Sequence, residues 1–244
     1  MKKNFTKAFL GICALGTSVV AFAQDAAPVV EQSFHQALKI KFIEGSADFM
    51  SLIAIALILG LAFVLERIIY LNLADTNADK LLKGVEAALD KGDVEAAKAI
   101  ARDTRGPIAS IFYQGLIRLD QGIDVVEKSV ISYGGVQGGL LEKNLSWITL
   151  FIAMAPTLGF LGTVVGMIMA FDKIEQVGDI SPTVVASGMK VALITTVGGL
   201  VVALILQIFY NYLLSKLEAI LNKMEDASIS LLDLVIKYNV KYNK

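Results

Sequence analysis

Two short stretches of small and hydroxyl-bearing residues are the part of this sequence that could do chemistry. In the first, APTLGFLGTVVG (155–166), three glycines recur at helical spacing and Thr163 lies on the same stripe. The second is TTVGG (195–199), with neighbouring hydroxyls at Thr195 and Thr196. A hydroxyl both donates and accepts hydrogen bonds, so it can pass a proton or hold a water molecule. Thr163, Thr196 and Thr195 are therefore candidates for a proton pathway.

The small residues around these hydroxyls predict close contact between two helices, because a bare backbone lets another helix approach. The candidate packing residues share a small or rigid side chain, and they are Pro156, Gly159, Gly162, Gly166, Gly198 and Gly199. A simpler alternative stays open. The threonines could bond only the backbone of their own helices, and the glycines could serve only packing.

Both stretches lie in long apolar segments. Residues 145–171 form twenty-seven uncharged residues, more than the roughly 20 that a helix needs to cross a bilayer. Residues 180–214 carry one charge, Lys190, and are too long for one crossing, so we expect a span at 191–214 preceded by an outer extension. A further span is predicted at 49–73. The fold class is therefore an all-α integral membrane protein with three transmembrane helices.

Composition supports this class and excludes others. Hydrophobic residues make up 55% of the chain and charged residues 18%, below the roughly 25% of soluble domains. The net charge of −1 gives no sign of a nucleic-acid partner. One cysteine, Cys13, and one histidine, His35, are too few for a zinc cluster, a disulfide framework or a Cys/His catalytic pair. We therefore expect no metal, no cofactor and no enzymatic activity.

The N-terminal residues 1–23 read as a signal peptide, with three early lysines, an apolar run and an Ala-Phe-Ala cleavage pattern. A retained first membrane helix is the alternative. Residues 24–48 would then lie outside the cytoplasm. Their Phe34, Leu38 and Phe42 are four residues apart, which predicts a short amphipathic helix on the membrane surface.

Between the first two spans, residues 74–144 predict a polar domain of four helices. Its glycines 134, 135, 138 and 139 indicate either close helix packing or a flexible hinge. Residues 172–179 predict a short charged loop, and 172–190 as a whole the outer connection. In the tail 215–244, a heptad-like seam is predicted at Leu217, Leu221, Met224, Ser228, Leu231 and Val235.

Charge sets the expected orientation. Residues 66–144 hold ten Lys/Arg and residues 215–244 hold five, whereas 24–48 and 172–190 hold two each. The domain and the tail are therefore predicted inside, with the N-terminus and the short loop outside. Glu66-Arg67 near the inner end of the first span reads as a snorkelling arginine beside a carboxylate rather than as part of an ion path. Lys190 either snorkels or forms a ring of charge at the outer mouth.

The second-span motif APTLGFLGTVVGMIMAF, preceded by LEKNL, resembles the MotA/TolQ/ExbB family of proton-driven motor subunits. The third span, GMKVALITTVGGLVVA, is similar to that family as well. The resemblance covers about residues 49–225, and the three-span layout matches ExbB and TolQ. It implies a bacterial inner-membrane ring of five identical subunits around the single-span helices of an ExbD- or TolR-like partner. The partner's aspartate would carry protons past Thr163 and Thr196, and the ring would energise a TonB-like protein.

The sequence departs from this family at one point. Where many members carry a glutamate in the third span, this chain has Val191, with Lys190 beside it. A proton-binding carboxylate within the second or third span is therefore not available. The leading hypothesis is an ExbB-like subunit that energises outer-membrane transport. The alternatives are a TolQ-type subunit of the envelope-constriction system and a membrane scaffold that conducts no ions.

Overall fold

The computed structural model describes residues 34–178 and 182–242. The predicted signal peptide, residues 1–23, lies outside the described residues. Contacts divide the chain into a first unit, residues 1–43, and a second, residues 44–244. Helix α2, Phe34–Glu44, belongs to the first unit except for its last residue. Its exposed Leu38, Ile40 and Ile43 face more than one side, so apolar residues are not confined to the predicted stripe.

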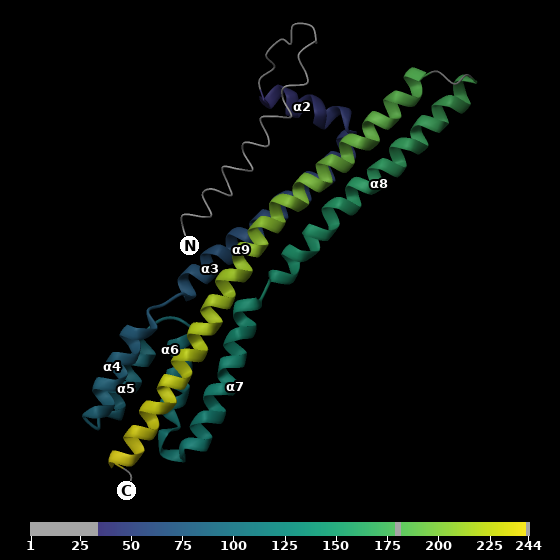
Figure 1. Ribbon diagram of the computed structural model, residues 1–244. Coiled ribbons are helices and arrows are strands. Elements are labelled where there is room, and N and C mark those ends of the chain that lie inside the picture. The colour runs from purple at the N-terminus through teal and green to yellow at the C-terminus, as the bar shows by residue number, and fades with distance from the viewer. Residues whose placement is uncertain (1–33, 179–181, 243–244) are drawn as a thin grey trace, which may run out of the picture. The chain divides into compact units, whose positions relative to one another are not determined.

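The second unit is built on three long helices, α3 (Ala47–Ala74), α8 (Leu145–Val177) and α9 (Pro182–Tyr242). Each contains a segment that is long and apolar enough to cross a membrane. Helices α8 and α9 lie side by side, and α3 packs against both (Figure 1). The protein is therefore an all-α integral membrane protein, as its sequence predicts.

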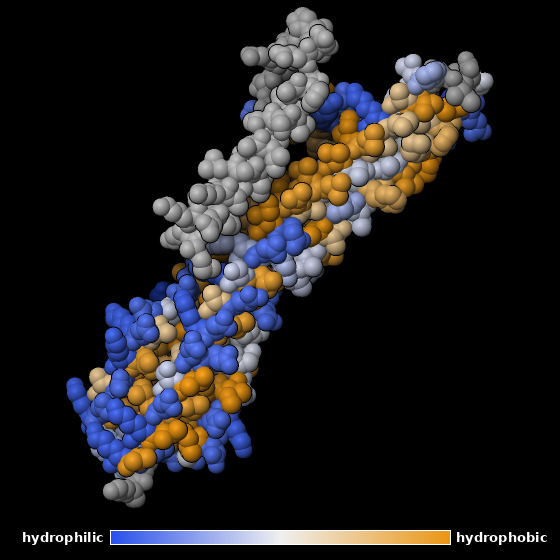
Figure 2. Space-filling view, in the orientation of Figure 1, coloured by the Kyte–Doolittle hydropathy of each residue, from blue (hydrophilic) through white to orange (hydrophobic). Residues whose placement is uncertain are grey.

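Helix α3 shows why these helices need a lipid environment. Its buried positions follow helical spacing along one face, and they are Ile53, Ala56, Gly60, Val64, Arg67, Leu71 and Ala74. Large apolar side chains such as Ile55, Ile58 and Ile69 are exposed on its other faces. Figure 2 shows a similar hydrophobic surface along α8 and α9. A helix that is apolar on all sides is stable only when it is buried in protein or in a membrane.

A domain of four helices follows α3: α4 (Ala78–Asp90), α5 (Val94–Asp103), α6 (Pro107–Ile117) and α7 (Ile123–Glu142). A one-turn 3-10 helix, η2 (Leu119–Gln121), connects the last two. Capping side chains and a proline explain where three of these helices begin. The side chains of Asn77 and Asp93 accept backbone N–H bonds at the first turns of α4 and α5. Pro107 occupies the first turn of α6, where the N–H that it lacks has no helical partner.

The four clustered glycines of α7 do not interrupt this helix, which runs continuously to Glu142. A Cβ added to Gly138 would contact Leu221 of α9, whereas one added to Gly135 or Gly139 would meet no atom within 4 Å. This contact, at 3.5 Å, and the one of 3.9 Å between a Cβ on Gly134 and Ile111 are ordinary van der Waals contacts, so packing within one chain requires none of these four glycines. The chain breaks instead just after α7, where Asn144 adopts a left-handed conformation (φ 68°) before α8 begins.

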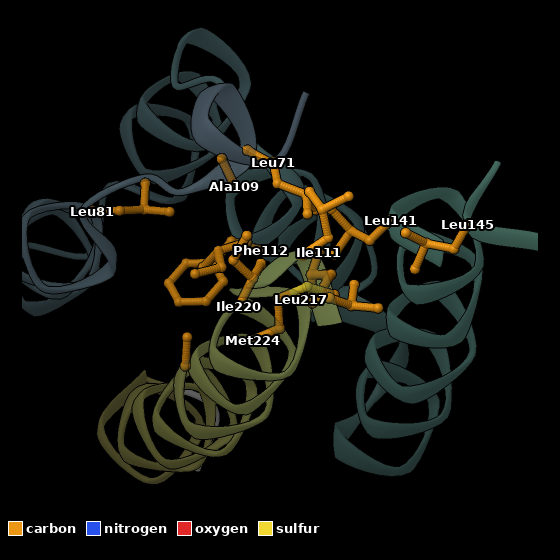
Figure 3. Close-up of a cluster of buried hydrophobic side chains, with 14 of the residues drawn as sticks. Leu71, Leu81, Ala109, Ile111, Phe112, Leu141, Leu145, Leu217, Ile220 and Met224 are labelled. Atoms are coloured by element: carbon orange, nitrogen blue, oxygen red, sulfur yellow. The ribbon is translucent and has the colours of Figure 1, made fainter. Parts of the chain in front are cut away.

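One apolar core extends from the three long helices into this domain. Figure 3 shows part of it, to which four helices contribute Leu81, Phe112, Leu141 and Ile220. The predicted seam of α9 is confirmed at Leu217, Met224, Leu231 and Val235, which are buried. It is wrong at Leu221 and Ser228, which are partly exposed, because Ile220 and Ala227 are buried in their place.

The predicted loop at 172–179 is also wrong, because α8 continues as a helix to Val177. Gly178, with φ 70°, ends it in a left-handed conformation that suits glycine. The charges of Asp172, Lys173 and Glu175 made this segment look like a loop. They occupy instead the end of a helix that extends past the apolar stretch.

Arg67 does not snorkel as predicted, because its side chain is only 3% exposed. The guanidinium binds the neighbouring Glu66, with Nε donating to Oε2 at 2.6 Å, and lies over the Tyr70 ring at 4.5 Å. Asn144 Nδ2 donates to the same Glu66 oxygen at 3.4 Å. The charged pair is therefore part of the α3 contact with the α7–α8 junction.

An ion pair joins the end of α3 to α9 and predicts a pH effect. Lys223 Nζ donates to Asp75 Oδ1 at 2.6 Å, and this bond holds the pKa of Asp75 below its usual range. Its stabilisation is complete above the pKa of the unfolded chain and is lost as the pH falls through the lower folded pKa. We expect thermal melting, followed by the single Trp147, to lose this acid sensitivity in Asp75→Asn. Identical pH profiles for the two proteins would contradict the assignment. The neutral-pH cost should stay below about 1 kcal/mol, because the pair is partly exposed.

Candidate functional site: the α8–α9 hydroxyl contact

Helices α8 and α9 run antiparallel and meet through small residues at regular intervals. Gly199 faces Ala155, Gly162 faces Thr195, and Gly166 faces Ala192. Further along, Gly188 faces Ala170. Each step moves four to seven residues along α8 and three or four residues back along α9, so the contact has one register. The predicted packing role of Gly159, Gly162, Gly166 and Gly199 agrees with this geometry.

The fit is too close for larger residues at these positions. A Cβ on Gly159 would lie 2.9 Å from the Thr195 carbonyl oxygen and 3.2 Å from the Cα of Thr196. A Cβ on Gly199 would overlap the carbonyl oxygen of Ala155. Because these neighbours are backbone atoms, they cannot rotate out of the way. The glycines therefore bring the two backbones together and place the threonines between them.

Thr163 and Thr196 meet at this contact. Their hydroxyl oxygens lie within hydrogen-bonding distance of each other. Thr163 Oγ1 also lies 3.2 Å from the Gly159 carbonyl of its own helix and 3.1 Å from the Ala192 carbonyl of α9. Thr196 Oγ1 has the matching set, at 3.2 Å from Ala192 O and 3.4 Å from Gly159 O. The site therefore consists of two hydroxyls and two shared carbonyls.

This arrangement has two equivalent orders of hydrogen bonds. Each hydroxyl has one proton to donate. If Thr163 donates to Thr196, then Thr196 donates to one of the carbonyls, and the reverse order satisfies the same atoms. Both side chains are only partly buried. The pair can therefore reverse its direction without moving a backbone atom, which is what a hydroxyl relay requires.

The remaining candidates lie elsewhere. Thr195 is buried and donates to Ala192 O of its own helix at 2.8 Å, so its hydroxyl does not reach the Thr163 pair. Gly198 faces Met50 of α3 rather than α8. Pro156 lies inside α8, where its missing N–H leaves the carbonyl four residues earlier without a helical donor. For Thr195, the alternative of bonding its own backbone fits the geometry.

Lys190 lies near the N-terminal end of α9 and pairs with Glu44. The Nζ–Oε1 distance is 2.7 Å, and the lysine side chain is 52% exposed. No local pattern indicated this partner, which is 146 residues away in the chain. The ion pair fastens α9 to the segment that precedes α3.

A double substitution separates this pair from a ring of free lysines at the outer mouth. If the pair matters, Lys190→Gln and Glu44→Gln should each lower the thermal stability by less than about 1 kcal/mol, and the double variant by no more than either alone. Melting curves followed by Trp147 fluorescence measure this. Additive losses would contradict the pair. An activity change in Lys190→Gln alone would favour the ring.

The shared carbonyls of Gly159 and Ala192 were not predicted from the sequence. A signal for them was available, because each precedes a site threonine by four residues and threonine hydroxyls in helices bond to that carbonyl. Within residues 34–178 and 182–242 no cluster of acidic, histidine or cysteine residues could hold a metal ion.

Three helices that are long and apolar enough to cross a membrane, two of which meet at a pair of hydroxyls, define an integral membrane protein with several spans. The sequence model of the MotA/TolQ/ExbB proton channel family matches residues 103–226, which include α8, the hydroxyl contact and most of α9. The chain belongs to this family.

Curated relatives agree with this assignment. An ExbB homolog of Methanothermobacter thermautotrophicus, described as a biopolymer transport protein, is 30% identical over 176 residues, which cover 71% of this chain and 62% of that one. The biopolymer transport protein exbB1 of Vibrio cholerae is 37% identical over 89 residues, or 33% of this chain and 39% of that one. ExbB of Aquifex aeolicus is 36% identical over 78 residues, or 32% and 53%. The chain thus matches less than two thirds of the length of these relatives.

Proposed function

We propose that this chain is an ExbB-type subunit of a motor driven by the proton-motive force in a bacterial inner membrane. The observation that carries the proposal is the reversible hydroxyl pair of Thr163 and Thr196 at a glycine-lined contact between two spans. A purely structural contact of this closeness would need no hydroxyls on both helices. The relatives described as biopolymer transport proteins favour ExbB over TolQ.

In this proposal the proton is carried by a carboxylate of a partner chain. No acidic residue lies within 145–171 or 191–214, so these spans of the subunit do not supply one. A carboxylate crosses lipid far more easily when it is neutral. It would take up a proton at one side, pass Thr163 and Thr196 uncharged, and release the proton at the other. The membrane potential supplies about 2.3 kcal/mol per proton per 100 mV.

The assembly that we propose is a ring of five copies around the single spans of an ExbD- or TolR-like partner, acting on a TonB-like protein. The domain 74–144 and the tail 215–244 lie on the cytoplasmic side, and the connection 172–190 lies in the periplasm. The charge distribution along the chain supports this orientation.

Native mass spectrometry tests the assembly directly. The chain would be co-expressed with a candidate single-span partner and released gently from membranes. A mass of five subunits with two partners is the expected result. A ring that never retains a partner would overturn the motor and leave a membrane scaffold, for which the hydroxyl pair has only a structural use.

A further inference from the structure

Helix α9 carries two amide side chains inside the apolar segment that is long enough to cross a membrane. Gln207, Asn211 and the hydroxyl-bearing Ser215 are four residues apart, and all three are exposed. None of these side chains forms a hydrogen bond within residues 34–178 and 182–242. No charge lies between Lys190 and Lys216. Ser215 therefore marks the end of the uncharged segment, and the two amides lie within it.

The depth of Gln207 makes lipid an unfavourable neighbour for its amide. Residue 203 is the midpoint between Lys190 and Lys216, and Gln207 lies only four residues, or about 6 Å, beyond it. The hydrocarbon core of a bilayer is about 30 Å thick and offers no hydrogen bonds. An amide that has no hydrogen-bond partner in apolar surroundings is costly. This side of α9 is therefore expected to face water or another polar group rather than lipid.

The two amides lie on the same side of α9 as the hydroxyl pair. Eleven residues separate Thr196 from Gln207, which is about three turns and leaves them about 20° apart around the helix axis. Asn211 is about 60° from Thr196 in the same direction. Thr163 and Thr196 are only partly buried, so the pair lies at an open edge of the α8–α9 contact. In the ring that we propose, this edge faces the central partner, and neighbouring copies lie to either side. The amides then face the same central space.

The other half of this side of α9 is apolar. Met189 precedes Gln207 by eighteen residues, as Leu193 precedes Asn211. Eighteen residues make about five turns, so each apolar residue lies in line with one of the amides. Their side chains are 46% and 62% exposed. Thr196 therefore lies between an apolar half and a half with amides, and the amides are on the side of the four-helix domain.

We infer that Gln207 and Asn211 line a water-filled vestibule, which opens beside the four-helix domain and ends before the hydroxyl pair, at the exposed Leu200. The partner's carboxylic acid, once it has passed the pair, gives its proton to a water molecule there. The amide N–H groups of Gln207 and Asn211 donate to the carboxylate that remains. Met189 and Leu193 offer no such bonds, so the other half stays dry. The inference rests on the proposed function for the position of the partner.

Cysteine accessibility tests the vestibule without any need for motor activity. Gln207→Cys and Asn211→Cys are made in a Cys13→Ser background, and each chain is co-expressed with the candidate partner. Membrane fragments that are open on both sides are treated with a charged, membrane-impermeant thiol reagent, and the labelling rate is measured by mass spectrometry. We expect both cysteines to react at least about tenfold faster than the control cysteines, because a thiol reacts as its thiolate and apolar surroundings disfavour that form.

Ile208→Cys is the control at the same depth, because Ile208 is 63% exposed and lies about 100° further round α9 than Gln207. Leu193→Cys is the control in the apolar half. Both should react slowly. If Gln207→Cys and Asn211→Cys react no faster than Ile208→Cys, a neighbouring copy or lipid covers the amides and the inference is overturned. Equally fast labelling of Leu193→Cys would also overturn it, because water would then reach both halves.

Energised transport tests the part that the amides play in proton exchange. Gln207→Leu with Asn211→Leu should lower it at least about tenfold, because the carboxylate loses its hydrogen-bond donors. Gln207→Asn with Asn211→Gln keeps both amides and should retain most of the activity. Full activity of the leucine variant would overturn proton exchange at this place. Slow labelling in a working motor overturns the vestibule alone, whereas fast labelling in a ring that retains no partner overturns the motor alone. Trp147 fluorescence melting confirms that each variant is folded.

Discussion

Thr163→Val is expected to lower proton-driven activity by on the order of 10- to 100-fold while leaving the assembly intact. Valine keeps the shape of threonine but cannot donate or accept a hydrogen bond. The Thr196 hydroxyl then keeps only the two carbonyls as partners, and the reversible order of bonds is lost. A hydrogen bond to a group whose charge changes contributes about 1.5–3 kcal/mol, and losing one during proton transfer corresponds to this range of rates.

Thr157 of the same helix supplies the matched control. Its hydroxyl is exposed and contacts only carbonyls of α8, those of Ala153 and Met154. Thr157→Val should therefore keep full activity, and Thr163→Ser should restore most of it. The assay is energised transport, or dissipation of a proton gradient, with the partner present. Normal activity of Thr163→Val in an assembled ring would exclude the hydroxyl relay.

Gly199→Ala is expected to destabilise the membrane core by about 3 kcal/mol or more, or to prevent its assembly. The new methyl group would overlap the Ala155 carbonyl oxygen, and overpacking against a rigid backbone typically costs about 1–3 kcal/mol and sometimes more. This cost outweighs the roughly 1 kcal/mol that alanine gains over glycine inside a helix.

The neighbouring glycine is the control for this second prediction. At Gly198 the added Cβ would lie 3.2 Å from the end of the Met50 side chain, which is flexible and can move. Gly198→Ala should therefore be neutral or slightly stabilising. Detergent-solubilised protein is melted while Trp147 fluorescence is recorded. Equal melting temperatures for the two variants would mean that α8 and α9 do not meet in the register described.

Much of this fold can be predicted from the sequence because membrane spans are long and apolar. The three long apolar helices follow from hydropathy, and the four helices of the domain follow from glycine and proline positions and begin within a few residues of where they are predicted. The likeness to the family was confirmed by its sequence model. The loop predicted at 172–179 was wrong because charged residues at the end of a long apolar helix resemble charged residues in a loop.

The site was predictable only in part. The close contact between the helix of Thr163 and the helix of Thr195 and Thr196 follows from their matching small-residue stripes. Which of two adjacent residues faces the partner, Thr195 or Thr196, depends on a rotation of about 100° that composition does not encode. Contacts between residues that are far apart in the sequence are harder still to predict. The Lys190–Glu44 ion pair and the burial of Arg67 depend on the tertiary fold, and no local pattern announces them.

The continuity of α9 has a mechanical consequence. It is one helix of 61 residues, which at 1.5 Å per residue is about 90 Å long. Helix α8 has no such continuation, because Asn144 separates it from α7. In the proposed motor, a rotation that starts near Thr196 would be transmitted along α9 to the helices packed around its far end. Because the helix is interrupted at Asn144, α7 and α8 would not transmit it as one continuous rod.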